Sequence, residues 1–147
     1  MTLLNDSETA GLAPPGRIVV GERAMSQRTL MLVLLWVVTG LEVLTMGLAG
    51  ATKFMNAEMW QGHFSSWSYP VWLVGVVGTV EIVGVVLLLI PRTALAAATG
   101  LIVLMIGALG TVLVFQSELG WFGPTLHLVL LSSIVWLRLR LSRTASS

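Results

Sequence analysis

Cysteine is absent from this chain of 147 residues, and charged side chains are scarce, at 10% of the total. Without cysteine the chain cannot form disulfides, thiolate zinc sites, cysteine-ligated iron–sulfur clusters or a thiol redox motif. Its two histidines, His63 and His127, fall in different segments, so a bis-histidine haem site is not expected. A formal net charge of +1 gives no basic surface for nucleic acid. We therefore expect no metal site, no covalently bound cofactor and no nucleic-acid partner.

Apolar side chains, in contrast, are abundant and make up 56% of the chain. This composition is typical of integral membrane proteins. Apolar segments long enough to cross a bilayer as helices lie at about residues 29–52, 71–90, 94–115 and 124–139. The sequence thus predicts an all-α protein, a transmembrane four-helix bundle in a single membrane domain over residues 29–139.

The basic residues are distributed unequally between the two ends of these segments. The positions on one side are Arg17, Arg23, Arg28, Arg92, Arg138, Arg140 and Arg143. On the other side only Lys53 is found. The side rich in Lys and Arg is cytoplasmic. We therefore expect a multi-pass protein whose tails, residues 1–28 and 140–147, lie in the cytoplasm; the first tail is flexible or laid against a partner.

The second segment, residues 71–90, carries one ionisable side chain, Glu81, near its middle. In a helix about 30 Å long this carboxyl lies near the bilayer midplane, where an exposed carboxylate costs at least ~2–3 kcal/mol. It must be protonated, paired or turned toward a polar cavity. Gly78 and Gly84 flank it and allow another helix to approach closely. We expect an inward-facing, largely protonated Glu81, which either holds helices together or exchanges protons.

Glu42, in the first segment, is a second acid at nearly the same depth, about 15 Å below the outer surface. It shares a helix face with Lys53, which lies too far along the helix, about 16 Å, to neutralise it directly. The opposite face carries the small residues Gly40, Gly47 and Ala51. If these small residues face the other helices, Glu42 points outward and a second protein covers it. Alternatively, Glu42 turns inward and shares a proton with Glu81.

Residues 54–70 form the long loop between the first two segments, and this loop is rich in aromatic side chains. Such residues are typical of the membrane interface, where residues 55–60 are suited to a short helix. Trp60, His63 and Trp67 are candidate contacts for a ligand or a partner on the outer side. An exposed histidine without a partner motif is, however, usually an ordinary surface residue.

Several short motifs follow one another in a characteristic order along the chain. They are Gly50-Ala51-Thr52-Lys53-Phe54, Tyr69-Pro70-Val71-Trp72, Gly78-Thr79-Val80-Glu81, Leu88-Leu89-Ile90-Pro91 and Met105-Ile106-Gly107-Ala108. In this order and spacing, over roughly residues 34–137, the chain resembles the DoxX family of small four-span bacterial membrane proteins, particularly its DoxX-like branch.

The resemblance implies a four-helix bundle in the bacterial inner membrane. Members of the family are linked to terminal quinol oxidases, to thiosulfate:quinone oxidoreductases and to other membrane redox complexes, so a quinone is a candidate cofactor. The family's characteristic positions here are Gly50, Lys53, Gly78 and Glu81. Many DoxX-like sequences have a histidine after the third-segment threonine, where this chain has Thr111-Val112. Glu42 looks particular to this sequence.

Three functions remain open at this point. The favoured one is an accessory or structural subunit of a larger bacterial membrane redox complex, with other membrane subunits or further copies as partners and the lipid bilayer around it. Small size and the lack of a metal-ligand or nucleophile cluster favour this reading, and no catalytic residue is assigned. The alternatives are a quinone-linked oxidoreductase subunit that uses Glu81 for proton exchange, and a small proton-coupled carrier lined by Glu42 and Glu81.

Overall fold

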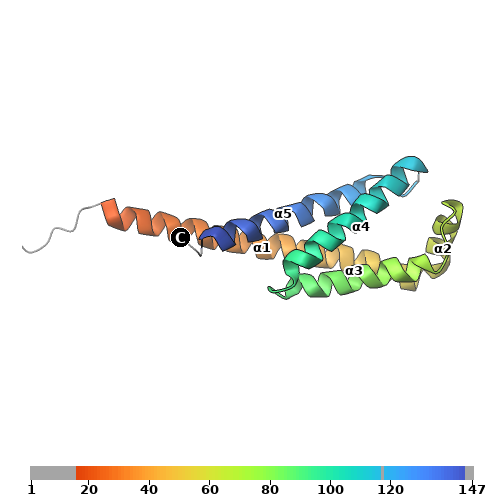
Figure 1. The fold of residues 1–147 in the computed structure, drawn as a ribbon, viewed down its shortest axis with the longest axis horizontal. Coiled ribbons are helices and arrows are strands. Elements are labelled where there is room, and N and C mark those ends of the chain that lie inside the picture. The colour runs from red at the N-terminus through yellow and green to blue at the C-terminus, as the bar shows by residue number, and fades with distance from the viewer. Residues whose placement is uncertain (1–15, 117, 145–147) are drawn as a thin grey trace, which may run out of the picture.

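The computed structural model describes residues 16–116 and 118–144 of the chain. This part is all-helical and contains no strand, as the sequence predicts. Its helices are α1 (Gly16–Met55), α2 (Ala57–Ser66), α3 (Leu73–Leu89), α4 (Ala94–Val114) and α5 (Phe122–Thr144), shown in Figure 1.

Three helices contain stretches long and apolar enough to cross a membrane, namely Gln27–Met55, Ala94–Val114 and Phe122–Arg143. The apolar helix α3 has 17 residues and is therefore about 25 Å long. It is shorter than the expected segment 71–90, because Val71 and Trp72 form a turn and Ile90 has an extended backbone, with ψ 114°.

The two ends of the chain also differ from the expected boundaries. Helix α1 begins at Gly16 rather than near Thr29, so residues 16–28, expected to form part of a tail, continue its backbone. Helix α5 runs past residue 139 to Thr144. The remaining residues of the expected tails, 1–15 and 145–147, lie outside the described residues.

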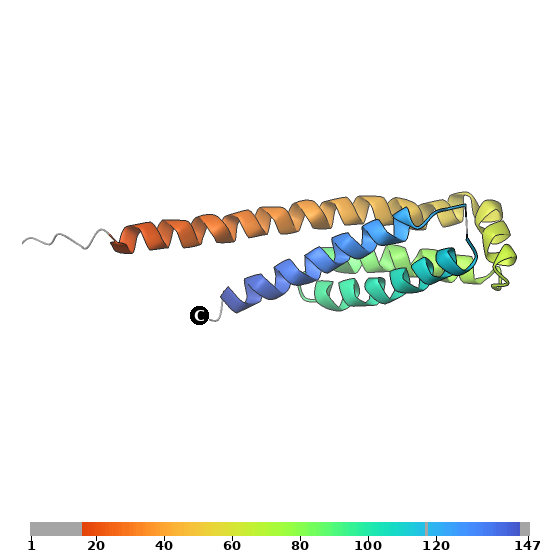
Figure 2. The same cartoon turned by 90° about the horizontal axis from the view of Figure 1, so that it is seen from above.

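The long helices α1, α3, α4 and α5 pack side by side. Helix α1 contacts α3 and α5, and helix α4 contacts the same two helices from the other side. The short helix α2 lies across one end, against α1 and α3, and the α4–α5 connection lies at that end too (Figure 2). The start of α1, the α3–α4 turn and the end of α5 lie toward the opposite end.

The buried apolar core draws on all four long helices. Its members are Leu35, Met46, Val85, Leu88, Ala98, Leu101, Met105, Leu131, Ile134 and Leu137. Many other large apolar side chains, such as Trp36, Leu44 and Val103, are exposed. Inward-packed and outward-facing apolar surfaces on the same helices are what a protein surrounded by lipid requires.

The turn between α3 and α4 is as tight as the Pro91-Arg92-Thr93 sequence predicts. Thr93 Oγ1 donates to the carbonyl of Leu87 at 2.9 Å. Arg138 Nη2, from α5, donates to the carbonyl of Leu88 at 3.3 Å. The last carbonyls of a helix have no partner within the helix, so these side chains stabilise the end of α3.

The inward face of α1 is the opposite of the one favoured by its small residues. Glu42, Met46 and Lys53 are buried, whereas Gly40 is exposed and a Cβ added there would meet no atom within 4 Å. Of the two rotations left open, the one that turns Glu42 inward is therefore found, although a Cβ added at Gly47 would lie 3.9 Å from Val85 Cγ2 of α3. Exposing a carboxylate and an ammonium to lipid costs more than close glycine packing gains, so the charged face turns inward.

Candidate functional site

Among the residues that the structure describes, four ionisable side chains are buried between the long helices. Glu42 and Lys53 come from α1, Glu81 from α3 and His127 from α5. Their exposed fractions are 0%, 6%, 3% and 9%, respectively. Since an ionisable group in an apolar interior needs a partner, the question for each is which group it contacts.

Lys53 and Glu81 form one pair between α1 and α3. Lys53 Nζ lies 2.7 Å from Glu81 Oε2. The same ammonium donates to the carbonyl of Ala49 at 3.4 Å and lies 4.5 Å from the centroid of the Trp60 ring. Glu81 faces inward as predicted, and Lys53 is a partner that the sequence did not indicate; the protonated state of the carboxyl stays a prediction.

Two glycines allow this pair to form. A Cβ added at Gly50 would lie 3.2 Å from Glu81 Cβ and 3.2 Å from the carbonyl oxygen of Gly78. A Cβ added at Gly78 would lie 3.2 Å from Lys53 Cβ and 3.3 Å from the carbonyl oxygen of Gly50. Each glycine thus makes room for the charged residue of the other motif, and Gly-x-x-Lys and Gly-x-x-Glu act together as one helix crossing.

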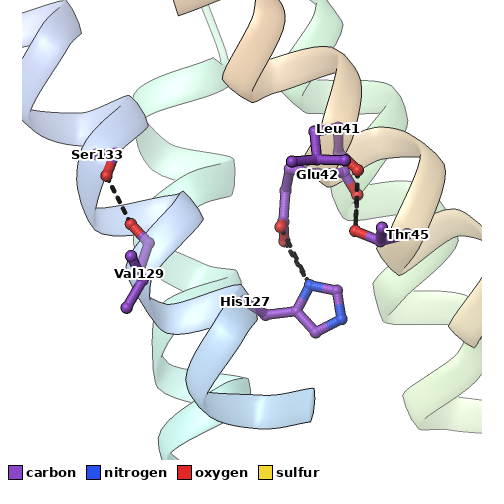
Figure 3. Close-up of polar contacts among 6 residues, drawn as sticks. All are labelled: Leu41, Glu42, Thr45, His127, Val129 and Ser133. Carbon is purple, nitrogen blue, oxygen red and sulfur yellow. Dashed lines mark hydrogen bonds and ion pairs between the residues drawn. The ribbon is translucent and has the colours of Figure 1, made fainter. Parts of the chain in front are cut away.

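Glu42 and His127 form the second pair, between α1 and α5. Figure 3 shows the carboxyl of Glu42 and the imidazole of His127 pointing toward each other. His127 Nδ1 lies 3.0 Å from Glu42 Oε2 and 3.2 Å from Glu42 Oε1. Glu42 is fully buried within the chain and therefore does not need a second protein to cover it. Its partner is His127, not Glu81. Glu42 thus turns inward, as one of the two expected resolutions has it, but toward His127 rather than Glu81.

Sequence reasoning missed His127 as a site residue. Nothing local marks it, because its partner lies 85 residues away in the chain. The usable signal was that Glu42 and His127 are both ionisable residues in apolar segments, and each needs a partner of opposite character.

The two pairs belong to one polar interior. Both pairs include a buried residue of α1, and their partners come from α5 and α3. Carboxylate, imidazole and ammonium groups can all hold and exchange protons. The arrangement is therefore suited both to locking α1, α3 and α5 together and to holding protons between them.

Of the expected outer-loop contacts, Trp60 and His63 lie on α2 and Trp67 follows directly at its C-terminal end. This helix, Ala57–Ser66, begins and ends later than the expected residues 55–60. The His63 ring lies 6.1 Å from that of Trp60 and is stacked on that of Trp67 at 5.9 Å, measured between ring centroids. Trp60 Nε1 is buried and has no hydrogen-bond partner among the described residues. A role for these three side chains in ligand or partner contact stays a prediction.

The comparison with protein families agrees with the resemblance seen in the motifs. The model of the DoxX-like family matches residues 37–134, about two thirds of the chain. The matched region includes both glycine motifs and all four buried ionisable residues. No curated protein and no solved structure gives a match. The chain therefore belongs to the DoxX-like family.

Proposed function

We propose that this protein is an accessory or structural subunit of a larger bacterial membrane complex, a redox complex in particular, without catalytic activity of its own. The observation that carries the proposal is the pairing of Lys53 with Glu81 and of Glu42 with His127 inside the chain. Groups locked in such pairs hold helices together. The apolar outer faces of the same helices remain available to lipid and to further subunits.

The proposal includes a four-helix bundle that spans the bacterial inner membrane, with both termini in the cytoplasm. Three helices meet the length and hydropathy of a span, and α3, at 17 residues, lies at the lower end of the usual range. Interfacial aromatic residues precede α3 at Tyr69 and Trp72, and Arg92 follows it. The basic residues of the other segments favour the same orientation.

Single cysteines at Ser66 and Ser142 test this topology. Both serines are exposed, Ser66 at the end of α2 and Ser142 near the end of α5. We expect an impermeant thiol reagent to label the Ser66 position from outside intact cells and the Ser142 position only in inverted vesicles. The unmodified chain contains no cysteine and is the blank. Labelling of both positions from one face contradicts the four-span topology.

The accessory role is tested by purification from native membranes in a mild detergent. We expect further membrane subunits to co-migrate with the tagged chain at a fixed stoichiometry through two successive columns. A lone, monodisperse chain would speak against the accessory role. Proton-coupled solute uptake by vesicles that contain only this chain would instead identify a carrier.

A quinone-linked subunit is the second candidate, and the buried indole N–H of Trp60 favours it. This donor lacks an acceptor among the described residues, and its ring lies beside His63. A quinone has a flat ring and carbonyl oxygens, so Trp60 would hold it by donation and His63 by stacking. When bound, a quinone supplies two-electron, two-proton redox chemistry.

Tryptophan fluorescence distinguishes this candidate. We expect a short-chain ubiquinone analogue to quench the purified protein saturably, and Trp60→Phe to abolish the saturable part. Trp36→Phe, at an exposed position on α1, is the matched control and should leave it. Quenching that is linear in quinone concentration, or equal in the two variants, would contradict a quinone site at Trp60.

A further inference from the structure

We propose that Glu42 and His127 form an intramembrane proton-binding site that holds one exchangeable proton. The proposal goes beyond an accessory role, because it gives the interior of the protein a ligand of its own. It is carried by the charge balance among the buried groups, by the contacts of each pair and by an unused hydroxyl beside Glu42.

Charge balance requires protons in this interior. Fully deprotonated, the four buried groups would carry the negative charges of Glu42 and Glu81 with nothing to offset them. A net charge between helices in a membrane is expensive. The interior is neutral only when two protons are bound, which corresponds to one in each pair.

The first of these protons is fixed on Lys53. Its nitrogen contacts the Glu81 carboxylate at 2.7 Å, the carbonyl of Ala49 and the face of the Trp60 ring. All three contacts suit an ammonium group, which donates hydrogen bonds and accepts none. The Lys53–Glu81 pair is thus neutral as a whole and does not need to exchange its proton.

The second proton belongs to the Glu42–His127 pair. His127 Nδ1 lies within 3.2 Å of both carboxyl oxygens of Glu42. The proton can therefore sit on the imidazole, giving an ion pair, or on the carboxyl, giving a neutral hydrogen bond. Both forms leave the interior neutral, so the proton can move between the imidazole and the carboxyl without rearrangement of the helices, whereas its release leaves one negative charge on the pair.

Few other ionisable groups act on this pair. Helices α1 and α3 contribute Lys53 and Glu81, which contact each other, and α5 itself carries Arg138, which donates to the carbonyl of Leu88. Helix α4, Ala94–Val114, has no ionisable side chain along its length. Among the described residues, the ion-pair partner of Glu42 is His127 and that of Glu81 is Lys53, so the two pairs do not share a contact.

Thr39 carries a buried polar group about one helical turn from Glu42. It lies three residues before Glu42 on the same helix, is 1% exposed, and its hydroxyl has no hydrogen-bond partner among the described residues. Other helical threonines in the described part of the chain, Thr45 and Thr79, donate to the carbonyl four residues earlier. The Thr39 hydroxyl, about one helical turn from Glu42, is suited to hydrogen-bond a water molecule, and such a water could transfer a proton to or from the Glu42–His127 pair.

The test uses the full-length protein in lipid nanodiscs with His63→Gln, so that His127 is the only imidazole. Nitrogen NMR reports the protonation of His127, and infrared spectroscopy reports a protonated carboxylic acid. At neutral pH we expect one proton in the pair, seen as an imidazolium or as a protonated carboxyl. On alkaline titration the signal of that one proton should be lost.

Glu42→Gln provides the matched variant, because it removes the negative charge that the proton offsets. We expect neutral His127 at neutral pH in this variant and the loss of one titrating proton per chain. Glu58→Gln, at an exposed acid on α2, removes a carboxyl that does not contact the pair, so its His127 nitrogen signal should be that of the parent. A neutral imidazole together with no protonated carboxyl at neutral pH in the parent protein overturns the proposal, whether or not Glu42→Gln folds.

Discussion

Lys53→Met is expected to lower the free energy of unfolding by about 3–5 kcal/mol, the usual cost of removing one member of a buried ion pair. The substitution keeps an unbranched side chain of similar length but leaves the Glu81 carboxylate without its partner at 2.7 Å. Thermal unfolding in detergent, followed by circular dichroism and by size-exclusion chromatography of heated samples, measures the loss.

The double variant Lys53→Met/Glu81→Gln separates the ion pair from packing. With the carboxylate removed, no unpaired charge remains, and we expect most of the stability to return. Glu81→Gln alone should also destabilise, since it leaves the Lys53 ammonium facing a neutral amide. If Lys53→Met costs less than about 1 kcal/mol, a value typical of exposed pairs, Lys53 and Glu81 are not paired in the membrane interior.

The sequence predicts the helices of this protein better than it predicts their contacts. Helix α4, Ala94–Val114, lies within a residue of the expected segment, because an uninterrupted apolar run has only one way to satisfy its backbone in lipid. For α1 the sequence left two rotations open, and the one that turns Glu42 inward is found. A small residue such as Gly40 permits close approach but does not show that a neighbour is there, since a Cβ at Gly40 would meet no atom within 4 Å.

The Lys53–Glu81 contact shows why the pairing of buried charges could not be predicted from the sequence. Both residues were singled out, but estimates of depth placed Lys53 at the outer surface and Glu81 near the midplane. Side chains on a helix lean toward its N-terminus, and α1 and α3 run in opposite directions. Lys53 therefore leans away from the α2 end and Glu81 leans toward it. The crossing of Gly50 and Gly78 sets the register at which the two meet.

The same crossing gives the second large effect, for Gly78→Ala. The new methyl group would lie 2.8 Å from Phe54 Cε2, 3.2 Å from Lys53 Cβ and 3.3 Å from the carbonyl oxygen of Gly50. Phe54 can turn away, but the α1 backbone cannot move without separating the helices. We expect a loss of about 1–3 kcal/mol, as for an overpacked core, measured by the same unfolding assay.

Gly75→Ala is the matched control, on the same helix and about one turn away. A Cβ there meets no atom within 4 Å, so the higher helix propensity of alanine should make this variant as stable as the parent or slightly more stable.

Adding Phe54→Ala to Gly78→Ala removes the shortest contact and leaves the one to the Gly50 carbonyl. Full recovery in that double variant would mean that Phe54, rather than the helix crossing, limits the space at Gly78. Persistent loss, and a smaller cost of Gly78→Ala once Lys53→Met/Glu81→Gln is present, would show that the glycine crossing and the ion pair stabilise the protein as one unit.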